Sequence, residues 1–345
     1  MAAGGGLIFG RGIFAARVLS VAFSGDGKRV AAVAKGTPFF IWDTATGRTV
    51  GKISAKGWKA QRWSLALSPH GKLLAAPTTR SLVHSLLLPS TSQVIHPDNV
   101  TVWQVKPPNL HIRFTDFEPL NPHFANSLTF SPDGKYLAAG EIFEGPQGHL
   151  VVWDVAKAKA VRRFSRWGIG VFSVQFSPQS QVAGQPTGFR KSPVVLWDIR
   201  TGKTIRTYSG CDVVVMLAFS PGGGMLAGAR GRNICTWDVK TGKKLGSVRL
   251  KQGILVALAF SSDQSLVAAA GGVVSMWNTN MSREARRCAI PQIRMPAQFS
   301  PDGKLLAWGD VHKRLVHLWD VAGCKEIRSF KMPPVSKADA NAHVK

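Results

Sequence analysis

A short apolar run that ends in tryptophan, usually followed by aspartate, occurs seven times in this chain. The seven tryptophans are Trp42, Trp103, Trp153, Trp197, Trp237, Trp277 and Trp319. A repeat of about 40–45 residues with this dipeptide is typical of the blades of a β-propeller. Because such blades do not fold alone, the repeat predicts one ring over the 345 residues, where length alone would suggest about two domains.

A second motif precedes each tryptophan: a small apolar strand closed by a turn, as in LTFSPDGK (128–135) and AQFSPDGK (297–304). Proline presets φ at the first central turn position, and glycine supplies a positive φ, so each copy predicts a strand, a tight turn and a second strand. The tryptophan run is the third strand, and a T-G-K/R turn leads to a fourth. The sequence therefore predicts an all-β fold, a seven-bladed β-propeller of four-stranded antiparallel blades.

The repeated aromatic residues are expected to form the core between neighbouring blades rather than to touch a ligand. This applies to the seven tryptophans and to the residue that ends each first strand. Those residues are Phe23, Leu67, Phe130, Phe176, Phe219, Phe260 and Phe299.

The paired motifs resemble those of the WD-repeat family over roughly residues 15–332. The resemblance implies a non-catalytic scaffold that holds peptides or protein domains on one face of the ring. Family repeats often carry a Gly-His pair before the first strand and an aspartate before the third. Here both are mostly missing, with Asp310 as a remnant, so we expect the blades to depend mainly on apolar packing and backbone ladders.

The expected organisation has three parts. Residues 1–16 form an N-terminal extension, in which Leu7–Phe14 is predicted to add a strand or cap at the ring seam. Residues 17–332 form a single propeller whose first and last blades each own four strands. Residues 333–345 form a flexible tail. The insertion at 78–99 contains the apolar segment SLLLP, which we expect to cover an edge or to meet a partner.

The chain carries a net charge of +25, from 44 Lys and Arg against 19 Asp and Glu. This excess would attract nucleic acid, an anionic membrane or an acidic partner, or it is a compositional bias of the surface. Basic residues on both predicted faces favour the bias over a dedicated nucleic-acid site. No apolar run approaches about 18 residues, so we expect no membrane partner.

The four cysteines, Cys211, Cys235, Cys288 and Cys324, lie in different parts of the repeat and include no CxxC pair. This pattern predicts reduced thiols in a cytoplasmic protein, with a stray disulfide as the less favoured alternative, and we expect the protein to be a monomer.

Motifs that carry catalysis are missing from the sequence. It has no P-loop, no GxGxxG cradle and no G-x-S-x-G nucleophile elbow. The nine histidines are scattered without metal-ligand spacing, and His312 and His317 are expected to be packed or solvated. We therefore predict no catalytic residue, no cofactor and no metal. A sensor module or a hydrolase on the same fold is an alternative without support from any motif.

The entries of the innermost strands are the candidate binding site. Trp63, Phe172 and Met295 would form an apolar ring at the channel mouth, bordered by Arg62 and Arg294, which suits capture of a peptide. Further basic and aromatic residues are predicted on the same face: Trp58, Arg80, Trp167, Arg190, Arg232 and Arg314. The alternative is ordinary loop charges with packed aromatics. The leading prediction is a non-enzymatic protein–protein interaction scaffold for a peptide or acidic partner, and the first alternative is a basic nucleic-acid-binding propeller.

Overall fold

The computed structural model describes the part of the chain that forms the repeats. Strands make up its regular structure, and no helix among these residues is long and apolar enough to cross a membrane. The described residues are 17–333, except 35–36, 55–57, 61–63, 81–98, 115–123, 143–148, 166–169, 188–191, 213, 279, 291–292, 294 and 311–312. The predicted strand at Leu7–Phe14, the 333–345 tail beyond Pro333 and most of the 78–99 insertion lie outside them.

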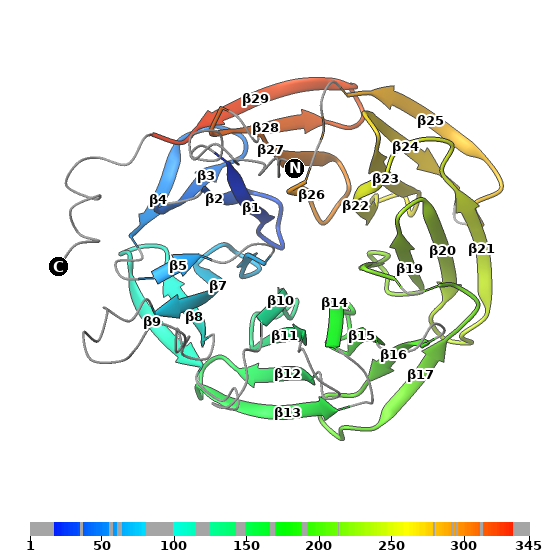
Figure 1. The fold of residues 1–345 in the computed structure, drawn as a ribbon, viewed down its shortest axis with the longest axis horizontal. Helices are drawn as coiled ribbons and strands as arrows, with labels where there is room; N and C mark the ends of the chain where they lie inside the picture. Colours follow the sequence, from blue (N-terminus) through cyan, green and yellow to red (C-terminus); the bar gives the residue numbers. More distant parts are fainter. Residues whose placement is uncertain are drawn as a thin grey trace, which may run out of the picture.

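Seven blades follow one another round a ring in sequence order (Figure 1). Blade 1 holds β1 (Val18–Phe23), β2 (Arg29–Ala34), β3 (Phe39–Asp43) and β4 (Thr49–Ile53). Blade 2 holds β5 (Trp58–Ala60), β6 (Ala66–Leu67), β7 (Leu73–Arg80), β8 (Asn99–Gln104) and β9 (Asn109–Phe114). Blade 3 holds β10 (Phe124–Phe130), β11 (Tyr136–Ile142), β12 (His149–Asp154) and β13 (Lys159–Ser165). Blade 4 holds β14 (Gly170–Phe176), β15 (Val182–Thr187), β16 (Val194–Trp197) and β17 (Thr204–Tyr208).

The last three blades repeat the plan. Blade 5 holds β18 (Met216–Phe219), β19 (Met225–Arg230), β20 (Asn233–Asp238) and β21 (Lys244–Arg249). Blade 6 holds β22 (Leu255–Phe260), β23 (Leu266–Ala270), β24 (Val273–Trp277) and β25 (Glu284–Ala289). Blade 7 holds β26 (Ala297–Phe299), β27 (Leu305–Gly309), β28 (Leu315–Asp320) and β29 (Lys325–Lys331). All strand pairs are antiparallel, and in blade 2 the innermost strand is split into β5 and β6. The predicted seven-bladed propeller is confirmed.

The ring closes by side-chain packing between blades 7 and 1, because each of these blades has its own four strands. Trp42 on β3 stacks on Phe330 of β29, with 5.1 Å between the ring centroids. Val18 and Phe23 join the same cluster as Val316 and Leu318 across this seam. The predicted ownership of strands at the seam is thus confirmed.

The seven repeat tryptophans are all buried and pack against the preceding blade, as predicted. One hydrophobic cluster fills each of the seven interfaces between blades. At several interfaces the outer strand of one blade supplies an aromatic ring to the tryptophan of the next. These pairs are Phe114–Trp153, Phe164–Trp197, Tyr208–Trp237 and Phe330–Trp42, with centroids 5.0, 5.1, 6.1 and 5.1 Å apart.

The outer strands carry a repeated bulge. The register shifts opposite the residue before each tryptophan, which places Arg162, Arg206, Arg286 and Arg328 at one repeat position. The Arg162 guanidinium donates to the Arg200 carbonyl of the next blade, and that of Arg328 donates to the Ala45 carbonyl at 2.8 Å. Part of the positive charge of the chain therefore holds neighbouring blades together.

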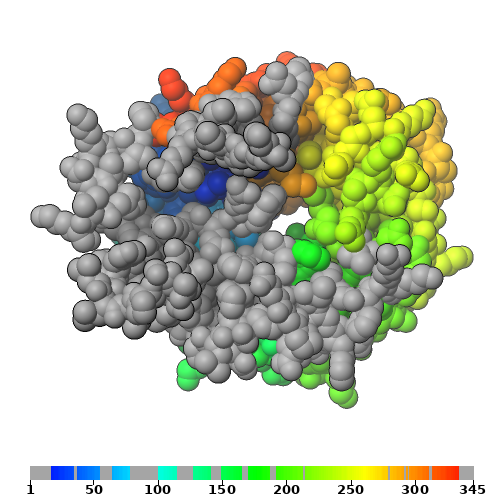
Figure 2. All heavy atoms as spheres, viewed as in Figure 1, coloured from blue at the N-terminus to red at the C-terminus, as the bar shows by residue number. Residues whose placement is uncertain are grey.

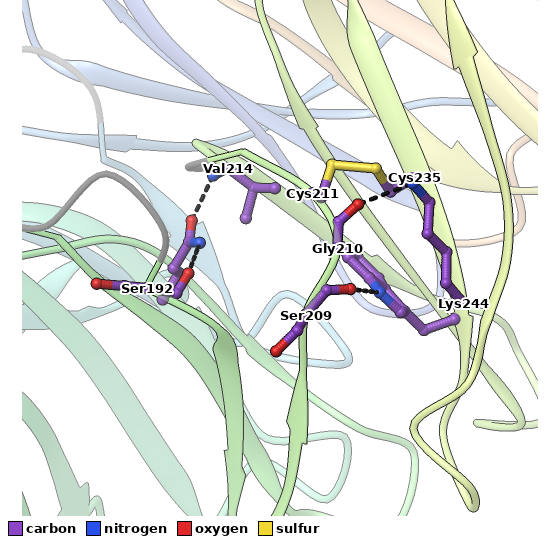
Figure 3. The surroundings of a disulfide bond; sticks show 9 residues. Ser192, Ser209, Gly210, Cys211, Val214, Cys235 and Lys244 are labelled. Atoms are coloured by element: carbon purple, nitrogen blue, oxygen red, sulfur yellow. Dashed lines mark hydrogen bonds between the residues drawn. A yellow bond between two sulfur atoms is a disulfide. The ribbon is translucent and has the colours of Figure 1, made fainter.

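The cysteines are paired, so the prediction of reduced thiols is wrong. Cys211, in the connection from blade 4 to blade 5, is bonded to Cys235 on β20, and their Cα atoms lie 6.3 Å apart (Figure 3). Cys288 on β25 is bonded to Cys324, in the turn before β29, with Cα atoms 5.7 Å apart. Both separations lie in the range that a disulfide spans. The repeat pattern hid the pairs because the partners occupy different repeat positions, which only the folded ring brings together.

Candidate functional site at the channel mouth

The innermost strands line a channel along the axis of the ring (Figure 1). The channel has two chambers, of about 350 and 390 Å³. The larger lies at the face of the first-to-second strand turns and is lined by prolines and serines of those turns. The smaller, here called the mouth chamber, lies where the first strands begin, on the face predicted to bind a partner.

Two residues of the predicted apolar ring line the mouth chamber. Phe172 on β14 and Met295, just before β26, are half-buried and line it together with Val215 and Val256. Trp63, Arg62 and Arg294, the other members of the predicted site, lie outside the described residues.

A row of serines in the same chamber was missed by our sequence analysis. Three residues before the last residue of the first strand, blades 1 to 4 carry Ser20, Ser64, Ser127 and Ser173. Blades 5 to 7 carry Met216, Ala257 and Pro296 at that position. The mouth chamber therefore has a hydroxyl-lined half and an apolar half. The signal was readable, because four consecutive repeats share the serine at one position.

Two of these serines join neighbouring blades. Ser127 Oγ accepts a hydrogen bond of 3.1 Å from the Val174 amide, and Ser173 Oγ accepts one of 3.1 Å from the Leu217 amide. A hydroxyl that accepts such a bond keeps its own proton to donate. The Ser64 hydroxyl is buried and has no hydrogen-bond partner within the described residues. An unpaired buried hydroxyl costs free energy, so a ligand that pairs with it would gain affinity.

The remaining predicted rim residues are placed at different points of the ring. Trp58 and Arg80 lie directly opposite each other on β5 and β7. Arg232, between β19 and β20, donates from Nε to the Leu250 carbonyl at 2.7 Å and from its terminal nitrogen to the Lys251 carbonyl. Arg314 is half-buried just before β28. Trp167 and Arg190 lie outside the described residues.

His317 has a packed environment. Its ring stacks on Trp308 with centroids 5.0 Å apart, Nδ1 lies 3.0 Å from Glu326 Oε1, and Nε2 lies 3.9 Å from Asp310 Oδ2. Asp310 thus faces His317, and its origin as a remnant of the family network remains a prediction. Within the part of the chain that the structure describes, no three His, Cys, Asp or Glu side chains gather as they would around a metal ion.

Seven antiparallel blades with tryptophans between them define the class of protein as a WD-type β-propeller. A family model, the WD domain or G-beta repeat, matches residues 118–154, a stretch that includes β10, β11 and β12 of blade 3. WD repeat-containing protein SL1-17 of Schistosoma mansoni is 28% identical over 52% of this chain and 60% of its own length. WD repeat-containing protein 1 of Mus musculus is 24% identical over 56% of this chain and 28% of its own. These matches and the seven-bladed ring confirm the resemblance to the WD-repeat family, and the chain spans less than two thirds of the length of these relatives.

Proposed function

We propose that this protein is a non-enzymatic scaffold that binds a peptide or an acidic protein segment at the mouth chamber. Propellers of this family commonly serve as protein-interaction scaffolds. The two-sided lining of the mouth chamber carries the proposal. Serine hydroxyls of blades 1 to 4 suit backbone and carboxylate oxygens. Val256 and Met295 on the opposite side, together with Phe172 of blade 4, suit apolar side chains.

An extended peptide fits such a chamber because its side chains alternate between two faces. One face would meet the apolar half and the other the serines. The net charge of +25 favours an acidic peptide, since complementary charge speeds association. A cytoplasmic location and a monomeric state remain predictions, and the disulfides remove the reduced-thiol argument for that location.

The proposal is tested by affinity purification with the full chain and with the double variant Phe172→Ala, Met295→Ala. We expect the double variant to lose the captured partner, because the two largest described apolar side chains at the strand entries of the mouth chamber are truncated. Lys203→Ala, in the turn between β16 and β17 on the opposite face, is the matched control and should capture the same partner. An unchanged capture profile for a double variant that still melts cooperatively would contradict the mouth chamber as the site.

The predicted residues Arg62 and Trp63 provide a second variant, Arg62→Ala with Trp63→Ala, with the same expected loss and an unchanged melt. Nucleic-acid binding is separated by titrating duplex and single-stranded DNA at rising salt. A phosphate-directed protein loses affinity steeply with salt. Tight binding of that kind, which Phe172→Ala leaves intact, would replace the scaffold proposal with the nucleic-acid alternative.

A further inference from the structure

One position in each outer strand faces the tryptophan of the next blade, and we call it the stacking position. The strand registers place it opposite the residue three before each blade's own tryptophan. The seven residues are Ile53, Phe114, Phe164, Tyr208, Val248, Cys288 and Phe330. Blades 2, 3, 4 and 7 have an aromatic ring at this position, and blades 1, 5 and 6 do not.

Two of these three interfaces are completed in another way. At the interface between blades 1 and 2, where the stacking position holds Ile53, Phe39 of β3 packs on Trp103 with ring centroids 5.2 Å apart. At the interface between blades 6 and 7, the stacking position holds Cys288, and its disulfide to Cys324 crosses the interface. Trp308 packs on Trp319 with ring centroids 6.1 Å apart.

The interface between blades 5 and 6 has neither a substitute aromatic pair of this kind nor a disulfide among the described residues. Val248 is only half-buried, and among the described residues no aromatic ring stacks on Trp277. Ser275, two residues before that tryptophan, is also small. A side chain smaller than the ring that the repeat provides elsewhere leaves unfilled space beside Trp277.

That space is an open slot of about 90 Å³ in the wall of the ring, here called the interblade slot. Its floor is formed by Val248, Ser275 and Trp277, and Arg249, Arg287 and Glu284 stand at its rim. It is lined by β21 and the segment that follows it on one side and by β23, β24 and β25 of blade 6 on the other, and none of its lining residues belongs to an innermost strand. Figure 1 shows these strands in the wall of the ring. Blades 5 and 6, drawn yellow-green to orange-yellow, form the right-hand side of the space-filling view (Figure 2).

The rim of the slot carries a positive excess. Arg249, Lys251 and Arg287 line it against a single acid, Glu284, and all four are exposed. None of the three cations forms an ion pair with another described residue. The Arg232 guanidinium donates to the carbonyls of Leu250 and Lys251, which fixes the end of β21 that forms one wall. The slot thus offers an apolar floor surrounded by unpaired positive charge.

We propose that the interblade slot binds one aromatic side chain of an acidic peptide segment. The partner's ring would lie beside Trp277 and supply the stack that Phe or Tyr supplies at other interfaces. Carboxylates on either side of that ring would pair with Arg249, Lys251 and Arg287, because arginine recognises carboxylates with two parallel hydrogen bonds. This site is separate from the mouth chamber and does not depend on the function proposed there.

The probe is a fluorescein-labelled peptide of sequence Asp-Glu-Phe-Glu-Asp, and its partner probe has alanine in place of phenylalanine. Binding to the full chain is measured by fluorescence anisotropy. We expect the aromatic probe to bind about tenfold tighter than the alanine probe, which is about 1.4 kcal/mol. Both should weaken as salt rises, because the charged rim is screened. Equal binding of the two probes would overturn the proposal.

Val248→Phe fills the interblade slot from within and should weaken the aromatic probe about tenfold (~1.4 kcal/mol), to the level of the alanine probe. Leu245→Phe is the matched control, because it adds a ring on the exposed side of the same strand and should leave binding unchanged. Should Val248→Phe fail to fold, Arg249→Glu with Arg287→Glu replaces it, since both side chains are exposed and outside the core. Unchanged binding by either folded slot variant sinks the proposal.

Phe172→Ala separates this site from the mouth chamber. It should leave the aromatic probe bound as in the wild type, because Phe172 lines the channel and not the wall. Loss of the probe in Phe172→Ala, with retention in Val248→Phe, would assign the aromatic anchor to the mouth chamber and overturn the slot.

Discussion

Blade 3 and blade 5 follow one plan and differ at two points. Both contain a repeat tryptophan that is 0% exposed, Trp153 and Trp237. In blade 3 the stacking position holds an aromatic residue, Phe164, which stacks on Trp197 of blade 4. In blade 5 the same position holds only Val248, which faces Trp277 of blade 6.

The second difference lies in the first turn of each blade. In blade 3 the Ser131 hydroxyl donates to Asp133 Oδ1 at 2.6 Å, whereas glycine, Gly222, stands at the equivalent place in blade 5.

This comparison separates what the fold needs from what it tolerates. The tryptophan is present in every blade, but the ring that stacks on it is not, so the stack adds stability beyond the minimum for folding. Burial of one aromatic residue contributes a few kcal/mol, a large share of the total stability of a domain. An interface left without its stack therefore costs stability, and the same vacancy leaves room for another molecule's side chain.

The largest difference between the two kinds of interface is expected on removal of the tryptophan itself. Trp197→Ala should destabilise the fold by about 4 kcal/mol, because a buried ring is lost and Phe164 loses its partner. Trp277→Ala should cost about 3 kcal/mol, since no described ring stacks on it. Denaturant midpoints of the two variants measure this, and an equal loss would contradict a contribution from the stack.

A loss of stability similar to that of Trp277→Ala is expected at the interface of blades 6 and 7, where a disulfide stands at the stacking position. Cys288→Ser with Cys324→Ser should lower stability by about 3 kcal/mol, because the bond closes a loop with a sequence separation of 36 residues. Thermal melts with and without reductant measure the effect. The Cys211 pair is the comparison, and if reductant destabilised the double variant as much as the wild type, Cys288–Cys324 would not be the bond that matters.

Phe164→Val gives the interface between blades 3 and 4 the valine that blade 5 has at its stacking position, Val248. It should cost about 2 kcal/mol, from lost burial and the space left beside Trp197. It should also open a slot there like that between blades 5 and 6. The melt gives the stability change, and a variant as stable as the wild type would show that the stack contributes little in either place.

Much of this architecture was predictable because the repeat states it seven times. The Trp42 to Trp319 series and the S-P-D-G turns determined blade number, strand order and the core between blades. The serine row from Ser20 to Ser173 was equally readable, because it occupies one repeat position.

The rest depends on register. A bulge in each outer strand decides which residue faces the next tryptophan, and nothing in the letters KLGSVR marks Val248 as that residue. Valine is also an ordinary strand residue, so its small size at the stacking position becomes visible only beside the rings at equivalent positions. The Cys288–Cys324 pair was hidden for the same reason, since it joins two blades at unlike positions.

The reverse exchange, Val248→Phe, should stabilise the fold by about 1 kcal/mol, because it restores a ring beside Trp277 in space that is already open. The gain is smaller than the loss in Phe164→Val, since a new ring does not pack as well as one around which the interface was built. The melting temperature should rise in Val248→Phe and not in Leu245→Phe. A fall in melting temperature would indicate that the slot is too narrow for a ring.

The smallest expected effect on stability concerns the turn between the first and second strands of each blade. The pKa of the Asp133 carboxyl lies below its usual value, because burial, which raises it, is outweighed by the hydrogen bonds from Ser131 Oγ and the Lys135 amide. A carboxyl with a depressed folded-state pKa contributes stability above its unfolded pKa of about 3.9, and that stability is lost as pH falls through the folded value. Blade 5 lacks this contribution.

Gly222→Asp should supply it. Apart from the chain neighbours of Gly222, no atom of the described residues lies within 4 Å of where the new Cβ would stand. Ser220 Oγ already accepts a hydrogen bond of 3.0 Å from the Met225 amide, as Ser131 Oγ accepts one from the Tyr136 amide. We expect a gain of about 0.5 kcal/mol at neutral pH, limited by solvent exposure of the turn. The gain should shrink as pH falls below the unfolded value of about 3.9 and vanish below the folded-state pKa of the new carboxyl, where that carboxyl is protonated. Gly222→Asn is the matched control, because it places an amide of the same shape there and should show no such pH dependence. If the advantage of aspartate over asparagine did not shrink as pH fell below about 3.9, the carboxylate would not be its source, and the difference between the turns of blades 3 and 5 would have to lie in the backbone freedom of glycine.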